Sequence, residues 1–362
     1  PRVEYDADGN RLGLLVEEAR TNLLPYSEDF STDWNNTNSD IDVNPYGGSA
    51  PDGQASGFEI SEPSTTTTHA LRDTHSFTSG LSYTFSVFAK KSTSDWCQLL
   101  FGAGAFSSMH QNFNLATGQK GGGSGFNSSE IQDYGNGWYR ISITATATVT
   151  ASTDIFIVLT DNADSARLPS YLGDGTSGIY IWGAQLEAGS FPTSYIKNEG
   201  TSSGVTRSAD VVSIPVADFG FNTGAGTFVA EFDFTDPQND DHNYVISGGS
   251  YARIIYNNAS QSSWQAFDGV AGVSYGSLDN TGASRFKAAV AVNESANDTA
   301  TFLDGNLAST RTLSFSLMTN LKGEDLNIGN GFSSGQKLNG HIKSIKYYPR
   351  RLTNAQLQEL TS

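Results

Sequence analysis

Residues 227–234, with the sequence TFVAEFDF, decide the fold class that this chain predicts. The even positions hold Phe, Ala, Phe and Phe, whereas Val229, Glu231 and Asp233 occupy odd positions. Successive side chains of a β-strand point to opposite faces of the sheet. We therefore expect the even positions to face a core, and Val229, Glu231 and Asp233 to face outwards.

Further strand-like stretches follow one another at short spacing. They include LSYTFSVFAKKS (81–92), GWYRISITATATVT (137–150), IFIVLTD (155–161) and RFKAAVAVN (285–293). Turns rich in glycine and serine separate them, and the chain contains 38 glycines in 362 residues. Such a pattern is typical of antiparallel sandwiches. The predicted fold class is all-β, with two tandem antiparallel β-sandwich (jelly-roll) domains.

The chain divides into four predicted segments. An Asp-Gly turn between alternating apolar residues indicates a β-hairpin at the N-terminus. A polar, Gly/Ser-rich stretch later in the chain indicates an interdomain linker. The predicted boundaries are 1–24 for the hairpin or lead-in, 25–198 for the first sandwich, 199–210 for the linker and 211–362 for the second sandwich.

The C-terminal segment departs from the strand pattern. Pro349 ends the last strand, and Thr353 is a residue type that caps helix N-termini well. Leu357 and Leu360 are three residues apart, so that they share one face of a helix. A short C-terminal helix that packs on the second sandwich is therefore predicted.

The net charge of −17 argues against several partners. A strongly acidic surface repels phosphate backbones and anionic membranes, so neither nucleic acid nor membrane insertion is expected. No apolar run approaches the ~18 residues of a membrane span. The single cysteine, Cys97, excludes an intramolecular disulfide. The chain starts at Pro1 without a visible signal peptide, as expected of a processed chain or an excerpt of a longer one.

Four segments carry a resemblance to known families. Residues 340–361, GHIKSIKYYPRRLTNAQLQELT, resemble the last strand and helix of concanavalin A-like, laminin-G-like jelly rolls. Residues 11–34, RLGLLVEEARTNLLPYSEDFSTDW, 179–196, IYIWGAQLEAGSFPTSYI, and 206–214, TRSADVVSI, resemble structural proteins of tailed bacteriophages. In those proteins a carbohydrate-binding-module-like sandwich precedes a laminin-G-like one.

The resemblance implies a function, although function depends on sites placed on such scaffolds. It implies a non-catalytic, carbohydrate-binding protein of the virion surface: a tail fibre, a head fibre or a spike. The implied partners are host cell-surface or extracellular polysaccharide and other virion proteins, and a homotrimer is expected. The implied location is the virion surface or the extracellular space. Structural decoration without a ligand, or a binding module of a larger secreted enzyme, remain alternatives.

Glu231, Asp233 and Asp236 raise an enzymatic alternative. Laminarinase- and agarase-type glycosidases have a similar fold and carry Glu-x-Asp-x-x-Glu on one strand. A retaining pair of carboxyl groups needs a separation of about 5–5.5 Å, which residues on one strand face can supply. Here the third position is an aspartate, and Pro237 follows it directly. The favoured interpretation is a solvated strand face with no catalytic residue. The alternative is a polysaccharide depolymerase that uses Glu231 and Asp236.

Sugar recognition needs apolar ring faces together with polar groups for hydroxyls. Trp96 and Trp264 both follow polar turns, and three residues of YARIIYNN (251–258) are expected to share one strand face. The predicted carbohydrate-binding residues are Trp96, Tyr251, Arg253, Asn257 and Trp264. The remaining tryptophans, Trp34, Trp138 and Trp182, are expected to pack in the core.

Two acidic loops are candidates for structural calcium, which prefers several oxygen ligands. One is DPQNDDHN (236–243), and the other is EDFSTDW (28–34). Neither has the Asp-x-Asp-x-Asp-Gly order of a dedicated calcium loop, so a polar loop is favoured for each. No other cofactor is expected, because the five histidines lack the cysteine partners and spacing of a zinc site.

Overall fold

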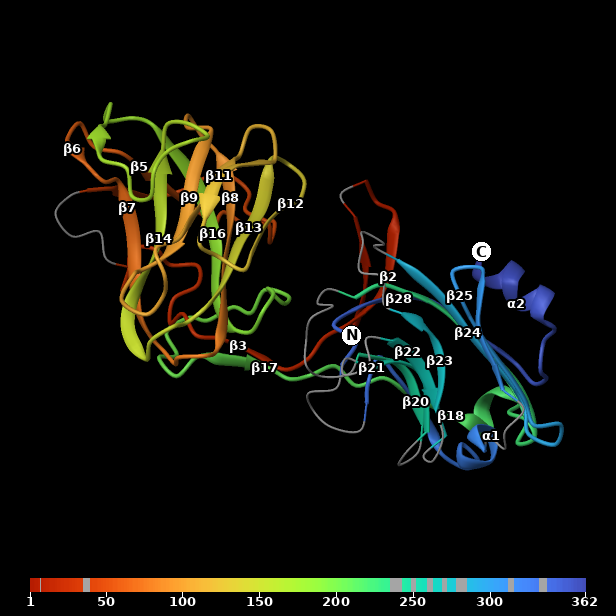
Figure 1. The fold of residues 1–362 in the computed structure, drawn as a ribbon. Helices are drawn as coiled ribbons and strands as arrows, with labels where there is room; N and C mark the ends of the chain where they lie inside the picture. The colour runs from red at the N-terminus through yellow and green to blue at the C-terminus, as the bar shows by residue number, and fades with distance from the viewer. Residues whose placement is uncertain are drawn as a thin grey trace. The chain divides into compact units, whose positions relative to one another are not determined.

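The computed structural model describes the chain in ten stretches: residues 1–6, 8–34, 40–234, 243–248, 252–258, 263–268, 272–277, 285–311, 316–331 and 337–362. Side chains are described for these residues except 256–258, 263–264, 272–277 and 311. The regular secondary structure of the described chain is nearly all β-strand, and its few helices are short (Figure 1). The all-β class and the antiparallel sandwiches predicted from the sequence are confirmed.

The chain forms two compact units, one inserted into the other. The terminal unit contains residues 1–19 and 208–362, and the inserted unit contains residues 20–207. Strand β3 (Arg20–Asn22) pairs antiparallel with β17 (Val205–Arg207), so the chain enters and leaves the inserted unit on adjacent strands. The predicted boundaries set residues 1–24 before the first sandwich. In the structure the hairpin within them instead joins the sheet of the terminal unit, because β2 finds its backbone partners in β28.

The inserted unit contains two larger antiparallel sheets. The six-stranded sheet has the order β12 (Ser128–Asp133), β13 (Trp138–Thr146), β8 (Ser82–Lys91), β16 (Gly178–Ala188), β5 (Phe58–Ser61) and β4 (Asp42–Pro45). The five-stranded sheet has the order β11 (Gln119–Ser124), β10 (His110–Asn114), β9 (Trp96–Phe101), β14 (Ala151–Thr160) and β7 (Ala70–Phe77). A small pair joins β6 (Thr66–Thr67) to β15 (Tyr171–Leu172).

The core of the inserted unit follows the period of two in its strands. On β8, Tyr83, Phe85, Val87 and Ala89 all lie in the main buried cluster, as the alternation predicts. Phe88 on the same strand belongs to a separate aromatic cluster. Because neighbouring residues of a strand face opposite ways, β8 contributes to both faces of its sheet.

The terminal unit also contains two antiparallel sheets. The seven-stranded sheet has the order β1 (Arg2–Tyr5), β2 (Arg11–Val16), β28 (Gly340–Tyr348), β19 (Ala225–Phe232), β24 (Phe286–Asn293), β25 (Asp298–Leu303) and β26 (Asn306–Arg311). The six-stranded sheet has the order β18 (Ser213–Pro215), β27 (Asp325–Ile328), β20 (Tyr244–Gly248), β21 (Ala252–Asn258), β22 (Ser263–Phe267) and β23 (Gly272–Ser277). The helices are η1 (Val216–Phe219), α1 (Leu317–Asn320) and α2 (Asn354–Thr361).

The side chains of strand β19 face the two sides of their sheet as the sequence pattern predicts, but the outer side is not solvated throughout. The core-facing prediction is confirmed, because Phe228, Ala230 and Phe232 are buried in the main cluster of the terminal unit. Val229 lies on the opposite face, as predicted, but it is not exposed to solvent there: it is buried in a cluster that includes Leu357 of α2. Helix α2 packs on β24, β25 and β26, and thereby covers part of the outer face of the sheet (Figure 1).

Helix α2 begins as predicted. The Thr353 side chain accepts a hydrogen bond from the Gln356 backbone N–H, and the Gln356 side chain bonds back to the Thr353 backbone. This capping box satisfies two backbone donors that a helix start leaves without partners. Within the part of the chain that the structure describes, no helix combines the length and apolar character that a membrane crossing requires.

Candidate functional site

The predicted carbohydrate-binding residues are distributed over both units of the chain. Trp96 lies on β9 of the inserted unit and is partly buried against the backbone of Gly121. Arg253 lies on β21 of the terminal unit, where its guanidinium stands 5.1 Å from the ring centre of Phe267 and 5.9 Å from that of Tyr244. Arg253 is thus occupied by rings of its own unit. Trp96 and Arg253 belong to two separate units, and their role in sugar binding stays a prediction.

The remaining predicted residues are only partly described. Tyr251 lies outside the described residues. Asn257 on β21 pairs in register with Trp264 on β22, but the side chains of both lie outside the described residues. The register shifts between Arg253 and Tyr256, which interrupts the strict alternation behind the predicted shared face.

The acids of β19 lie in a network of positive groups. Glu231 is 3.2 Å from Lys343 Nζ and 3.7 Å from the Arg285 guanidinium, both measured to its Oε1. Asp233 Oδ1 accepts hydrogen bonds from the backbone N–H of His341 at 2.7 Å and from its Nδ1 at 2.9 Å. Asp236, the third acid of the predicted motif, lies outside the described residues.

His341 connects this network to the N-terminal hairpin. Its Nε2 lies 2.8 Å from Glu4 Oε2, and Glu4 also pairs with Arg2. Burial lowers the pKa of His341, but hydrogen bonds to Asp233 and Glu4 outweigh it and raise that pKa to about 9. The imidazole is therefore protonated at neutral pH and bridges two carboxylates. A cation beside a carboxylate stabilises the charged form of that carboxylate. A carboxylic acid that donates a proton in a glycosidase instead needs surroundings that favour its neutral form.

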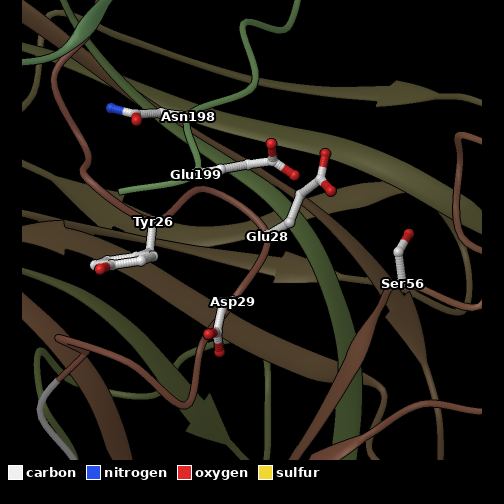
Figure 2. Close-up of a pocket in the computed structure, with 6 residues that line it drawn as sticks. All are labelled: Tyr26, Glu28, Asp29, Ser56, Asn198 and Glu199. Carbon is white, nitrogen blue, oxygen red and sulfur yellow. The ribbon is translucent and has the colours of Figure 1, made fainter. Parts of the chain in front are cut away.

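A hollow in the inserted unit combines polar side chains with an aromatic ring. It has a volume of ≈ 350 Å³ and is lined by Tyr26, Glu28, Asp29, Ser56, Asn198 and Glu199. Figure 2 shows that these side chains come from three separate parts of the chain, with Glu28 and Glu199 lying next to each other. We call this set the acidic pocket.

Backbone contacts hold the two longer segments of the acidic pocket together. Tyr26 and Glu199 form an isolated antiparallel bridge. The Ser27 backbone N–H donates to Asn198 O at 3.0 Å, and the Asn198 N–H donates to Ser27 Oγ at 2.8 Å. Trp34 Nε1 donates to the carbonyl of Tyr26 at 3.0 Å. The pocket thus lies beside the paired strands β3 and β17, where the chain enters and leaves the unit.

The acids of the pocket differ in their partners. Lys197 Nζ lies 2.9 Å from Glu28 Oε2 and 2.8 Å from Glu199 Oε1, and these bonds raise the pKa of Lys197. The Tyr195 hydroxyl donates to Glu28 Oε1 at 3.0 Å. Asp29 accepts hydrogen bonds from its own loop, with the Ser31 hydroxyl first among the causes that lower the pKa of Asp29. All three carboxylates thus have hydrogen-bond or ion-pair partners.

An aromatic cluster adjoins the pocket through Tyr195. The Tyr195 ring lies 4.6 Å from that of Trp182, which lies 5.2 Å from that of Phe88. Trp138 and Trp182 are buried, as predicted, but on the face of their sheet opposite the main core. At the edge of the cluster, the half-buried rings of Tyr46 and Tyr180 stack at 4.0 Å.

Flat rings beside oxygen acceptors are the two elements that a pyranose requires, one for its C–H face and one for its hydroxyls. The acidic pocket includes Glu28 and Asp29, which the sequence singled out only as calcium candidates. Among the described residues no group of three or more His, Cys, Asp or Glu is arranged to hold a metal ion. The Lys197 ammonium lies against Glu28 and Glu199 and supplies positive charge there. The second calcium candidate, residues 236–243, lies almost wholly outside the described residues.

Sequence reasoning missed Tyr26, Ser56, Asn198 and Glu199. No spacing rule connects them, because their positions are separated by up to about half the chain. The pairing of β3 with β17 and the neighbouring Tyr26–Glu199 bridge bring the first and last of these segments together.

Comparison with known proteins finds a family similar to most of the terminal unit. Residues 206–358 match the family model described as the concanavalin A-like lectin/glucanases superfamily. These residues are therefore similar to concanavalin A-like lectin/glucanase domains, in line with the sequence resemblance. Comparison with curated proteins gives no match.

Solved structures similar to the chain include three with carbohydrate-binding or pentraxin names. The CBM40 of a Ruminococcus gnavus IT-sialidase, bound to α2,3-sialyllactose, is 14% identical, with a TM-score of 0.32, and the match covers 39% of this chain and 84% of that one. A heptameric SAP-like pentraxin from Limulus polyphemus is 12% identical, with a TM-score of 0.31 and coverage of 39% and 70%. The N-terminal CBM22-1-CBM22-2 tandem domain of Xyn10C from Paenibacillus barcinonensis is 10% identical, with a TM-score of 0.29 and coverage of 92% and 98%.

Proposed function

We propose that this protein is a non-catalytic carbohydrate-binding component of a virion surface, and that it attaches the particle to host glycans as a tail fibre, head fibre or spike. The concanavalin A-like domain supports carbohydrate binding as the class of function. The virion setting is supported by the resemblance of residues 11–34, 179–196 and 206–214 to structural proteins of tailed phages.

The observation that carries the proposal is the acidic pocket. Its volume, ≈ 350 Å³, falls within the range of about 300–1,000 Å³ of small-molecule sites. Tyr26 offers an aromatic ring, and Glu28 and Asp29 offer carboxylate oxygens. Hydrogen bonds from sugar hydroxyls to carboxylates are charge-assisted and stronger than neutral ones.

The charge of the pocket restricts the class of glycan. Three of its six lining residues are acids, the adjacent Lys197 ammonium offsets only part of their charge, and the chain as a whole carries a net charge of −17. Like charges brought together at an interface cost free energy. The proposed ligand is therefore a neutral or amino sugar, and not a sialylated, uronic or sulfated one.

The ion pairs on β19 support the non-catalytic part of the proposal. Glu231 and Asp233 serve a network with Arg285, His341 and Lys343 that also reaches the N-terminal hairpin. The matching family model covers glucanases as well as lectins. A depolymerase that uses Glu231 and Asp236 is for that reason the second candidate function.

A homotrimer, the remaining part of the proposal, would present several copies of each pocket. Linked copies bind a polymeric glycan with an avidity well above the affinity of a single site. Mass photometry of the purified chain measures the number of copies, and a monomer at micromolar concentration would contradict the trimer.

The test of binding is a glycan array probed with the full chain, including neutral, amino and acidic bacterial polysaccharides. We expect retention of neutral or amino glycans. Glu28→Gln and Tyr26→Ala should each weaken binding by about tenfold, which corresponds to about 1.4 kcal/mol. Glu130→Gln, at an exposed position of β12, is the matched control and should bind as the wild type does.

Two outcomes would overturn the proposal. If the protein bound no glycan on the array, it would instead be a structural component of the particle without a ligand. Release of reducing sugar from a polysaccharide by the wild type, abolished in Glu231→Gln, would establish the depolymerase instead.

A further inference from the structure

A buried lysine in the terminal unit lies against a buried asparagine. Lys337 and Asn330 form an isolated antiparallel bridge between β27 and β28, and their exposed fractions are only 6% and 4%. Lys337 Nζ donates a hydrogen bond to Asn330 Oδ1 at 2.7 Å and another to the carbonyl of Asp210 at 3.0 Å. This contact belongs neither to the acidic pocket nor to the β19 network.

The surroundings favour a reactive amine. Burial lowers the pKa of Lys337, and the charge of Asp210 opposes this only in part. A lysine held in this way loses its proton more readily than one in water, and a neutral amine is a nucleophile.

Both partners are held in place by the backbone around them. The Ser247 hydroxyl donates to the carbonyl of Asn330 at 2.7 Å, and the Leu338 N–H donates to Gly329 O at 2.9 Å. The carboxamide carbon of Asn330 is one C=O bond, about 1.23 Å, beyond the oxygen that Lys337 already contacts. Reacting atoms held near about 3–3.5 Å gain much of the advantage of an intramolecular reaction.

We propose that Lys337 and Asn330 form an intramolecular isopeptide bond. A bond forms between Lys337 Nζ and Asn330 Cγ, and the bond between Cγ and Nδ2 breaks. The proton that Nζ loses passes to the departing nitrogen, which leaves as ammonia. No atom is oxidised or reduced, and no co-reactant is consumed. The Asp210 backbone carbonyl, which accepts a hydrogen bond from Lys337 Nζ at 3.0 Å, holds the amine beside the carboxamide.

The product would be a covalent tie at the base of the connection between β27 and β28. These strands lie in different sheets of the terminal unit, so the tie would join the two layers of its sandwich. A side-chain amide of this kind is resistant to reduction, unlike a disulfide, and this chain has only one cysteine.

The test is the intact mass of the purified full chain under denaturing conditions. The wild type is expected to be lighter than its sequence by one ammonia molecule, and Lys337→Met is expected to have its full sequence mass. Lys346→Met, at an exposed position of β28, is the matched control and should keep the deficit. A wild type with its full sequence mass overturns the proposal.

A competing reaction gives the same mass deficit and must be separated from it. Asn330 precedes Gly331, and Asn-Gly pairs can lose ammonia by closing to a succinimide. If the deficit comes from a succinimide, Lys337→Met keeps the deficit, and mild base restores mass to the wild type by addition of one water. Either result overturns the isopeptide bond. The cross-link instead predicts a tryptic peptide from Gly323 to Lys343 that is uncut at Lys337. It also predicts few fragment ions between the two linked residues.

Discussion

Replacing His341 by glutamine tests the network that fastens the N-terminal hairpin to the terminal unit. The imidazole lies between Asp233 and Glu4, at 2.9 and 2.8 Å, and its side chain is only 17% exposed. Glutamine can keep one hydrogen bond, but it carries no charge at any pH. The substitution therefore removes a positive charge from between two carboxylates and changes the volume of the site little.

The magnitude follows from the pKa of His341. It rises from 6.5 to about 9, and a tenfold change in proton affinity is worth about 1.4 kcal/mol, so the charged histidine stabilises the folded unit by about 3 kcal/mol. Because the folded pKa is the higher one, this contribution is complete below pH 6.5. It is lost as the pH rises through about 9.

The protonation of Glu4 sets the lowest pH at which the network stabilises the terminal unit. Burial raises the pKa of Glu4, but hydrogen bonds and charges from His341 and Arg2 outweigh it, so that the pKa of Glu4 falls on balance. A depressed carboxylate pKa stabilises the fold above its ordinary value of 4.5, and this stability is lost as the pH falls through the folded pKa. The combined contribution is therefore largest between about pH 4.5 and 6.5.

Hydrogen exchange of peptides from β19 and β28, measured against urea, gives the free energy of unfolding of the terminal unit alone. We expect His341→Gln to lower it by about 3 kcal/mol at pH 6, and by much less at pH 10. His75→Gln removes a histidine that pairs with Asp73 in the inserted unit, and should leave these peptides unchanged. The reasoning fails if His341→Gln lowers the free energy of unfolding equally at pH 6 and pH 10. It also fails if NMR gives the His341 ring a pKa at or below 6.5.

Three further outcomes are expected. Gly340→Ala places a Cβ 2.3 Å from the carbonyl oxygen of Asp233, so it should destabilise the terminal unit by about 3 kcal/mol; an unchanged thermal midpoint would contradict this. Thr353→Ala removes the capping box and should cost about 1 kcal/mol, seen as faster hydrogen exchange in α2 and not elsewhere. Burial raises the pKa of Cys97, so iodoacetamide should label it in urea and not in the native protein; equal rates in both would show that the thiol is accessible.

The sequence predicted those features that depend on residues close together in the chain. The core-facing positions of β19 follow from its period of two, and the start of α2 follows from the Thr353 capping box. Both depend on contacts within a few residues, and such contacts form in the same way whatever the rest of the chain does. The all-β class follows for the same reason, because many short strands and turns each carry their own local signal.

The outer face of β19 marks the limit of that reasoning. Alternation predicts that Val229, Glu231 and Asp233 share a solvated face. In the structure, Val229 is buried in a cluster that includes Leu357 of α2, whereas His341 and Arg285 pair with the acids. The pattern of one strand shows which residues share a face, but not which distant segment covers that face.

The candidate site depended on tertiary structure almost entirely. Glu28 and Asp29 stood out in the sequence as acids, but Asn198 and Glu199 become their neighbours through the pairing of β3 with β17 and the adjoining backbone contacts. The same applies to the hairpin that joins β28, which lies more than 300 residues along the chain. Strand periodicity and helix capping depend on interactions between residues close together in the chain, so the sequence alone predicts them. Which strands meet is decided by the burial and hydrogen bonding of the whole chain, so only the folded structure could assemble the pocket.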